Sequence, residues 1–395
     1  MLFKRGELKL LWPFYLDSVI SFILFFYPAF IVVYLLDIGL TPFRIGILMA
    51  VYAVSVILFE IPTGAFADLY GRKASVMLGY FFEIFVSLGI YFFKDYYSLM
   101  GLFIFWGFAY TFYSGASEAW RVDLINKKNK RLLNGFLMKR HSLVSAGLVI
   151  SGFLGVFVVS NFGLSSIWLF GAASFAVSMI ILLFAQEEFT RENLHIKDSF
   201  INIFRQVKES AKYSCSHPIL IPLSIVIFIF TASMFFNEGL TWVPLLKNYN
   251  FPNYAFGYMW AFMGAIGIFA PIFTKKLLKE NKEKNLLVFI TFLYLLSLVS
   301  IIFVSGIISA FIVLFLTTFF LNAKMPLDTI YFHKFIPSKM RATIGSFESL
   351  ISHFSSAIAP ILVGFLVTGI GAKYTIFSGA FLIIPVLIIY YLIKE

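Results

Sequence analysis

The chain has 395 residues, of which 60% are hydrophobic, 19% aromatic and only 13% charged. A soluble globular protein is about half apolar and about a quarter charged, so this composition excludes an ordinary soluble domain. The formal net charge is +11. Because the apolar residues come in long blocks, we assign the basic residues to loops beside a membrane and not to nucleic-acid binding. The single cysteine, Cys215, excludes an internal disulfide and gives no zinc or redox motif.

Apolar blocks of about 20 residues or more recur along the chain, and each is long enough to cross the roughly 30 Å hydrocarbon layer as a helix. The first block is too long for a cleavable signal peptide, and no small-residue cleavage site follows its early part. We therefore predict an all-α membrane protein. Its twelve transmembrane helices are predicted at about residues 10–35, 43–66, 74–93, 98–122, 135–160, 163–185, 218–246, 254–276, 285–304, 307–331, 342–369 and 372–393.

The longest polar stretch, 186–216, divides these spans six and six. It predicts an N-terminal half at 1–185, a linker at 186–217 and a C-terminal half at 218–395. Inside the linker, apolar residues recur at helical spacing, which predicts an amphipathic helix at the inner membrane surface. These apolar positions are Phe200, Ile203, Phe204, Val207 and Ala211.

The distribution of Lys and Arg predicts the orientation. If the N-terminus is cytoplasmic, the outer loops hold only Arg44, Lys94, Lys247 and Lys373. The remaining basic residues of the loops then fall on the inner side, as the positive-inside rule requires. We expect a multi-pass protein of the cytoplasmic membrane with both termini in the cytoplasm.

A short charged segment, Gly64-Ala-Phe-Ala-Asp68-Leu-Tyr-Gly71-Arg72-Lys73, separates the second and third spans. We interpret it as a loop whose two glycines allow a tight backbone. Asp68 stands four residues before Arg72, so the two can pair across one turn. The G-x-x-x-D-x-x-G-R-K spacing at this place resembles the signature loop of the major facilitator superfamily. The resemblance implies a secondary transporter of two six-helix halves, and not an enzyme.

Two further segments carry a resemblance to a prokaryotic branch of that superfamily whose permeases are often grouped with efflux proteins. They are Phe59-Glu60-Ile-Pro62-Thr63-Gly64 and Ser114-Gly115-Ala-Ser-Glu118-Ala-Trp120. These motifs indicate the branch and leave its cargo open.

The resemblance also implies a gating role for the segment at 64–73. In the family this loop is part of a cytoplasmic latch, and its Asp meets the start of span eleven when the inner side is closed. Here that residue is Asp68, and Ser338 and Thr343 are candidate caps for a helix that begins near Arg341. The simpler alternative is that these charges only hold a loop and anchor helix ends.

Span four ends in Glu118-Ala-Trp-Arg121-Val-Asp123, at the same membrane face as the charged segment. Opposite charges at one face can form ion pairs. We expect Arg72 to pair with Asp123 or Glu118, and Asp68 to pair with Arg121.

Ionisable residues inside spans indicate a cavity, because a charge at the bilayer centre costs about 2.5–3.5 kcal/mol on insertion scales unless it has a partner or faces water. The resemblance implies that spans one, four, seven and ten line the central path. Asp17, Glu238, Lys324 and Asp328 lie on these spans. Lys324 and Asp328 share a helix face, and we predict that Asp17 pairs with Lys324 or lies near it.

Asn237 and Glu238 form a second candidate pair, which can bind cargo or stabilise a break in the helix before Pro244. Burial disfavours the charged form of a carboxylate, so Asp17 is our first choice for a proton carrier. The alternative for Asp17 is a static ion pair with Lys324.

We expect a secondary active transporter that moves a small organic molecule by alternating access, through proton-coupled export of amphipathic, drug-like compounds. The alternative is uptake of a small polar or anionic nutrient, with Lys324 as its counter-charge. Its partners are the cargo, protons and the lipid bilayer, and we expect a monomer. We expect no cofactor or metal, because the histidines show no metal-ligand spacing and no nucleotide-binding loop occurs.

Overall fold

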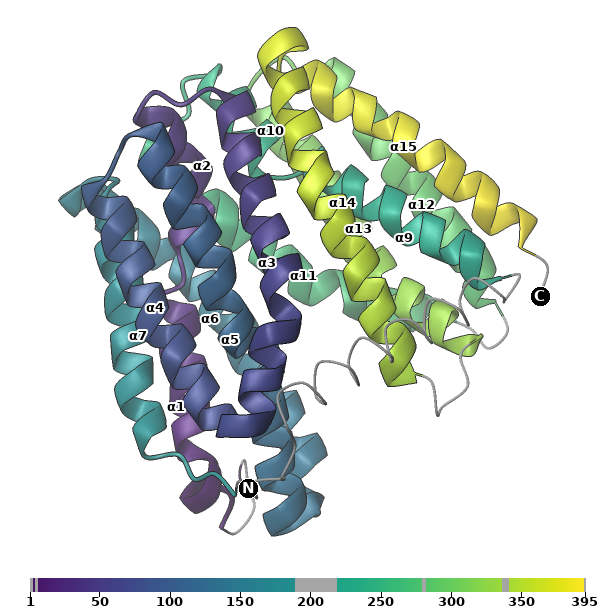
Figure 1. Cartoon of the computed structure of the whole chain (residues 1–395). Coiled ribbons are helices and arrows are strands. Elements are labelled where there is room, and N and C mark those ends of the chain that lie inside the picture. Colours follow the sequence, from purple (N-terminus) through teal and green to yellow (C-terminus); the bar gives the residue numbers. More distant parts are fainter. Residues whose placement is uncertain (1–2, 4–5, 189–218, 279–281, 336–340, 394–395) are drawn as a thin grey trace. The chain divides into compact units, whose positions relative to one another are not determined.

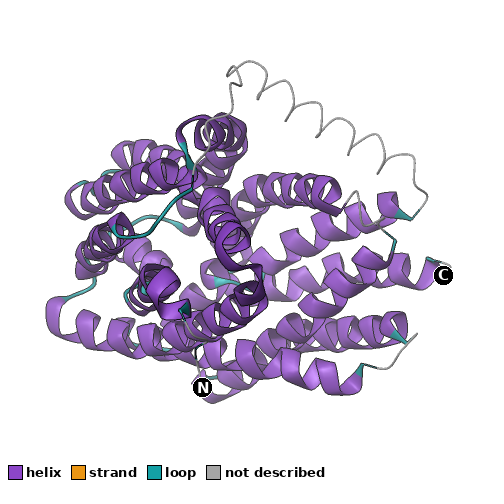
Figure 2. Ribbon diagram, turned by 90° about the horizontal axis from the view of Figure 1, so that it is seen from below, coloured by secondary structure: helices purple, strands orange, loops and turns teal. Residues whose placement is uncertain are grey.

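The structure is a computed structural model that describes residue 3 and residues 6–188, 219–278, 282–335 and 341–393, without the side chains at 333, 341–344, 346 and 347. Every regular element in these ranges is a helix (Figures 1 and 2). The longer helices are α1 (Glu7–Ile23), α2 (Tyr27–Asp37), α3 (Pro42–Tyr70), α4 (Arg72–Phe92), α5 (Tyr96–Asn129), α6 (Leu133–Phe162), α7 (Ser166–Leu183), α9 (Leu220–Phe235), α10 (Gly239–Lys247), α11 (Phe256–Leu277), α12 (Glu283–Val299), α13 (Ile307–Lys334), α14 (Arg341–Ile370) and α15 (Ala372–Leu392). The amphipathic helix predicted at 200–211 lies outside the described residues.

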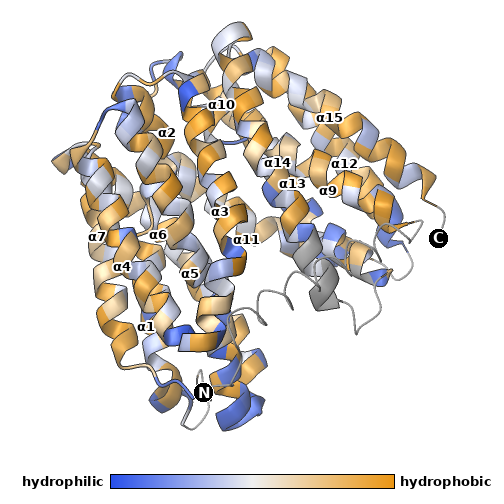
Figure 3. Ribbon diagram, in the orientation of Figure 1, coloured by the Kyte–Doolittle hydropathy of each residue, from blue (hydrophilic) through white to orange (hydrophobic). Residues whose placement is uncertain are grey.

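The helices are long and apolar enough to cross a membrane. In the described ranges eleven stretches qualify, and the longest, Tyr96–Phe162, has 67 residues. This stretch contains both α5 and α6, joined through the short 3-10 helix η1 (Lys130–Leu132). Counting α5 and α6 separately gives the twelve spans that the sequence predicts. Hydrophobic residues predominate along these helices (Figure 3).

Two of the predicted spans are interrupted. The first is divided into α1 and α2, and the seventh into α9 and α10. At the second break Glu238 is the N-cap of α10, and Pro244 lies inside that helix. Asn237 and Glu238 thus occupy a helix break before Pro244, which is one of the two roles that the sequence left open for them.

Internal contacts divide the chain into two compact units. Unit 1 contains Met1–Tyr34, Val54–Asn202 and Asn253–Ala261. Unit 2 contains Leu35–Ala53, Ile203–Pro252 and Phe262–Glu395. Helices α2, α3 and α11 therefore contribute residues to both units.

Unit 1 is built on α4, which packs against α5 and α7, and on α1, which packs against α6 and α7. Close approach of α4 to α5 depends on Gly79, because a Cβ there would lie 3.0 Å from the Cβ of Phe112. The apolar core includes Leu11, Phe14 and Trp120. Exposed Asp95 begins α5 by accepting the Ser98 N–H at 2.9 Å. The hydrogen bonds from Ser98 lower the pKa of the Asp95 carboxyl below its usual value.

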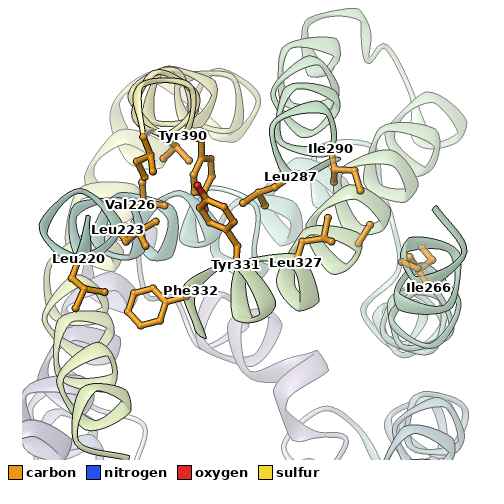
Figure 4. Packing of buried hydrophobic residues seen from close by; sticks show 14 residues of the cluster. Leu220, Leu223, Val226, Ile266, Leu287, Ile290, Leu327, Tyr331, Phe332 and Tyr390 are labelled. Carbon is orange, nitrogen blue, oxygen red and sulfur yellow. The ribbon is translucent and has the colours of Figure 1, made fainter. Parts of the chain in front are cut away.

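Unit 2 is built on α9, which packs against α14 and α15, and on α12, which packs against α13 and α15. Its apolar core gathers buried side chains from α9, α11, α12, α13 and α15 (Figure 4). Tyr331 of α13 and Tyr390 of α15 lie in this core with edge-on rings 6.2 Å apart. These two tyrosines place polar hydroxyls among apolar residues, beside the cavity described below.

Candidate functional site

The charged segment between α3 and α4 is a one-residue turn. Helix α3 continues through Tyr70 and α4 begins at Arg72, so Gly71 alone lies between them. The loop predicted at 64–73 is therefore wrong in extent, because residues 64–70 are helical. Gly71 has φ +98°, a conformation that side chains with a Cβ rarely adopt, whereas Gly64 has open space around its missing Cβ. Of the two glycines Gly64 and Gly71, only Gly71 has a backbone conformation that requires glycine.

Arg72 forms an ion pair with Asp123, which confirms one of the two partners predicted for it. The two side chains are 29% and 53% exposed, so water screens the pair. Asp68 lies in the last turn of α3, and α14 begins at Arg341 as expected. The proposed caps fall outside the description, since Ser338 and the side chain of Thr343 are not described.

The residues that follow α7 bind across the start of α4, which the sequence analysis missed. Glu187 accepts the backbone N–H of Lys73 at 2.9 Å. The Lys73 Nζ donates to the carbonyls of Leu183 at 2.7 Å and Ala185 at 2.8 Å. The Trp120 indole donates to the carbonyl of Gln186 at 3.0 Å. A carboxylate at a helix N-terminus accepts a hydrogen bond from a free backbone N–H and interacts favourably with the helix dipole. In the sequence, however, Glu187 stands at the beginning of the polar linker after α7, and nothing there indicates that it caps α4.

Unit 1 contains a cavity of about 290 Å³. Its wall combines charged groups, hydroxyls and aromatic rings from α1, α4, α5, α6 and α7. The lining residues are Asp17, Ser18, Ser21, Phe22, Phe25, Tyr80, Tyr110, Tyr113, Ser114, Ser117, Glu118, Arg121, Arg140, Ser174 and Phe175. Asp17 was predicted to face a cavity, whereas Glu118 and Arg121 were predicted at the gate and Arg140 was not selected.

Asp17 and Arg121 form a buried ion pair on this wall. Arg121 Nη2 donates to Asp17 Oδ2 at 2.9 Å, and the side chains are only 2% (Asp17) and 5% (Arg121) exposed. Ser21 also donates to Asp17, at 3.1 Å. The sequence predicted that Asp17 pairs with Lys324 or lies near it, and that Arg121 pairs with Asp68. In the structure Asp17 and Arg121 pair with each other, which corrects both predicted ion pairs. The spacing of residues in the sequence could not distinguish these partners, because each possible pair joins two different helices that are far apart in the chain.

Two arginines on the same wall keep unsatisfied donors. The Nε atoms of Arg121 and Arg140 are buried, and neither has a hydrogen-bond partner among the described residues. Arg140 is half-buried, and it lies within electrostatic range of Arg121, Glu118 and Asp17. The nearby Glu118 is exposed. The wall therefore contains two guanidinium groups, Arg121 and Arg140, whose hydrogen-bonding capacity is not fully used by the described residues.

Unit 2 contains a second cavity, of about 220 Å³. Lys324, with 0% exposure, pairs with Asp328 at 2.5 Å, and Tyr390 donates to the same carboxylate at 2.6 Å. The Lys324 ammonium also lies 3.5 Å from the centre of the Phe230 ring, a cation–π contact. The shared helix face predicted for Lys324 and Asp328 is thus confirmed. Glu348 of α14 lines this cavity as well.

Asn237 and Glu238 lie at the break between α9 and α10. The Trp242 indole donates to Asn237 Oδ1 at 2.9 Å, and Asn237 is 2% exposed. Neither Asn237 nor Glu238 is among the lining residues of the two cavities described above. Their observed contacts support the break between α9 and α10.

Comparisons with known proteins agree with this architecture. Residues 14–360 match the sequence profile of the Major Facilitator Superfamily. The chain is 26% identical to the uncharacterised MFS-type transporter YxaM of Bacillus subtilis (strain 168), over 87% of this chain and 86% of that protein. Among solved structures, a bacterial homologue of the iron transporter ferroportin in its inward-facing state has a TM-score of 0.75 at 14% identity, covering 98% of this chain and 99% of the other. The nucleoside transporter NupG has a TM-score of 0.71 at 13% identity, covering 97% and 99%.

Proposed function

Because the chain belongs to the major facilitator superfamily and is a multi-pass membrane transporter of that type, we propose that it couples the movement of a small organic molecule to protons by alternating access. The observation that carries the proposal is the buried Asp17–Arg121 pair on the wall of the unit 1 cavity. We place the protein in the cytoplasmic membrane with both termini in the cytoplasm, from the distribution of its basic residues.

The ion pair links a proton to a cargo through Arg121. In an apolar environment the two charges are stable only as a pair, since each unpaired charge loses its hydration. When Asp17 takes up a proton, its attraction for Arg121 weakens and the guanidinium needs another acceptor. Proton occupancy of Asp17 and the contents of the cavity therefore influence each other.

The cavity wall suits an amphipathic cargo. Rings such as Phe22, Phe25 and Phe175 offer apolar surface, and serine and tyrosine hydroxyls offer hydrogen bonds beside them. A cavity of about 290 Å³ accommodates a small molecule. If the cargo competes with the proton for Asp17, binding of one expels the other, which is proton antiport. Our first proposal is export of amphipathic, drug-like compounds by this route.

A specific observation favours the second candidate, uptake of a small polar or anionic molecule. The unsatisfied Nε atoms of Arg121 and Arg140 can receive an anionic group. Lys324, which the sequence suggested as the counter-charge, is already neutralised by Asp328 at 2.5 Å. A cargo that takes over the donors of Arg121 binds together with the proton on Asp17, which is symport.

We further propose that the turn at Gly71 acts in gating. In its support, Arg72 joins α4 to Asp123 of α5, and the segment after α7 binds the same turn. The test is Asp68→Asn, which should abolish transport and leave membrane insertion unchanged. Near-normal transport by that variant contradicts the gating role.

The two transport modes are separated in vesicles that contain the purified chain. Fluorescent dyes that are cationic, neutral or anionic are followed with and without an imposed proton gradient. Movement of a dye in the direction opposite to proton flow supports antiport. Accumulation of an anionic dye in the same direction as proton flow supports symport. If Asp17→Asn leaves gradient-driven movement intact, Asp17 has no part in coupling.

A further inference from the structure

The Asp17–Arg121 pair does not explain why the cavity of unit 1 has a second arginine, Arg140, in its wall. Asp17 engages a terminal nitrogen of Arg121 and leaves its buried Nε without a described partner. Arg140, on the neighbouring helix α6, has a buried Nε in the same condition. An unsatisfied buried donor costs about 1–3 kcal/mol, so two of them on one wall need a common explanation.

We propose that Arg121 and Arg140 form an anion subsite that receives the carboxylate of a small amphipathic organic acid. This rests on the proposed function, since it names the cargo class of the same cavity. A guanidinium offers its donors in a planar fork that matches the two oxygens of a carboxylate. Both arginines line the cavity, and the Nε of each is buried without a described hydrogen-bond partner.

The balance of charge in the wall supports an anion and not a cation. Its buried or half-buried part holds two guanidinium groups, Arg121 and Arg140, against one carboxylate, Asp17. The second carboxylate, Glu118, is exposed, so water screens its charge. A bound carboxylate restores neutrality where burial makes an excess charge expensive.

The remaining wall specifies the rest of the ligand. Aromatic side chains from three helices, Phe22 of α1, Tyr110 of α5 and Phe175 of α7, face the cavity. Such rings pack against an apolar or aromatic body. An aromatic carboxylate therefore combines both recognised features, whereas an inorganic anion offers only one.

The test compares three probes of one shape: 1-naphthoate, 1-naphthalenemethanol and 1-naphthylmethylammonium. Binding to the full-length chain in lipid nanodiscs is measured by thermal stabilisation over a range of concentrations. We expect naphthoate to bind about tenfold more tightly than the neutral alcohol, and the ammonium to bind most weakly. Equal affinities for the three probes overturn the proposal.

The matched variants are Arg140→Gln and Lys130→Gln, each of which removes one positive charge. Lys130 is exposed at the end of α5 and does not line the cavity. Arg140→Gln should remove the preference for naphthoate and keep the affinity for the alcohol, which also shows that the variant is folded. Lys130→Gln should keep the preference. If the preference survives Arg140→Gln, or is lost in Lys130→Gln, the subsite is wrong.

Transport measurements distinguish this proposal from the proposed function. Proton-coupled dye movement without any preference for naphthoate would contradict the subsite and leave the transporter proposal standing. A preference for naphthoate that Arg140→Gln abolishes, in a chain that moves no probe under a proton gradient, would support the subsite and contradict proton-coupled transport.

Discussion

Asp17 of α1 accepts a hydrogen bond from Arg121 of α5 at 2.9 Å, across 104 positions of the chain and with both side chains almost completely buried. Breaking one partner of a buried ion pair costs about 3–5 kcal/mol, because the other charge stays buried without compensation. Both the coupling proposal and the stability of unit 1 therefore depend on this contact, and mutation can separate the two.

The first prediction concerns Asp17→Asn. This variant should lose proton-driven transport, because asparagine cannot carry the proton. It should also melt at a lower temperature, because the buried charge of Arg121 loses its counter-charge. The double variant Asp17→Asn with Arg121→Gln should regain most of the thermal stability and none of the coupling. Thermal unfolding in detergent and a vesicle assay measure the two effects. Full recovery of coupled transport in the double variant would show that the pair is only structural.

The second prediction contrasts the two glycines of the motif. Gly71→Ala should destabilise the protein by about 1–3 kcal/mol, because φ +98° with ψ 147° is a conformation essentially restricted to glycine and Glu187 lies against that position. Gly64→Ala lies inside α3 with free space, and alanine favours a helix by about 1 kcal/mol. It should therefore unfold at the same temperature as the wild type or higher. Equal losses in both variants would contradict the one-residue turn.

The third prediction uses a charge reversal at Arg72 and Asp123. The pair is partly exposed, so Arg72→Asp or Asp123→Arg should change the unfolding free energy by no more than about 1 kcal/mol. Either single variant should nevertheless slow transport if the turn acts in gating, and the double reversal should restore it in part. The test is to compare the transport rates of the wild type, the two single variants and the double reversal at matched amounts in the membrane. Unchanged rates in both single variants would exclude a gating role for this pair.

The fourth prediction concerns the cap that Glu187 provides at α4. Glu187→Ala should cost about 1 kcal/mol, as the loss of a helix cap generally does, and Glu187→Gln less because its amide oxygen still accepts the Lys73 N–H. Glu188→Ala is the matched control, since Glu188 pairs with Lys128 at the surface. Thermal unfolding measures all three. A control as unstable as Glu187→Ala would indicate a general effect of charge in this segment.

The fifth prediction concerns the buried lysine of unit 2. Asp328→Asn leaves the Lys324 charge fully buried, so it should lower the melting temperature, although 27% exposure of Asp328 lets water compensate in part. Lys324→Met should be better tolerated in that background, because the apolar chain fills the same space beside Phe230. The double variant should melt above Asp328→Asn alone. A double variant that melts lower than Asp328→Asn would contradict this account of the pair.

The sequence by itself determined the class of this protein and the positions of its membrane helices. Apolar blocks of that length admit only helices, because the hydrocarbon layer offers no partner to an open backbone. It also determined local relationships, such as the shared face of Lys324 and Asp328, because these depend on helical spacing alone. For Asn237 and Glu238 it left two roles open, cargo binding or a helix break before Pro244. The partner of Arg72 was narrowed to two residues by their common membrane face.

Only the tertiary structure decided which distant charges meet. Asp17 could pair with any cation at its depth, and the packing of α1, α5 and α6 brings Arg121 to it and places Arg140 in the same cavity wall. The role of Glu187 likewise depends on where the chain passes after α7. Periodicity specifies which face of a helix a residue occupies. Which helix packs against that face depends on the arrangement of all the helices, and no local sequence pattern reveals that arrangement.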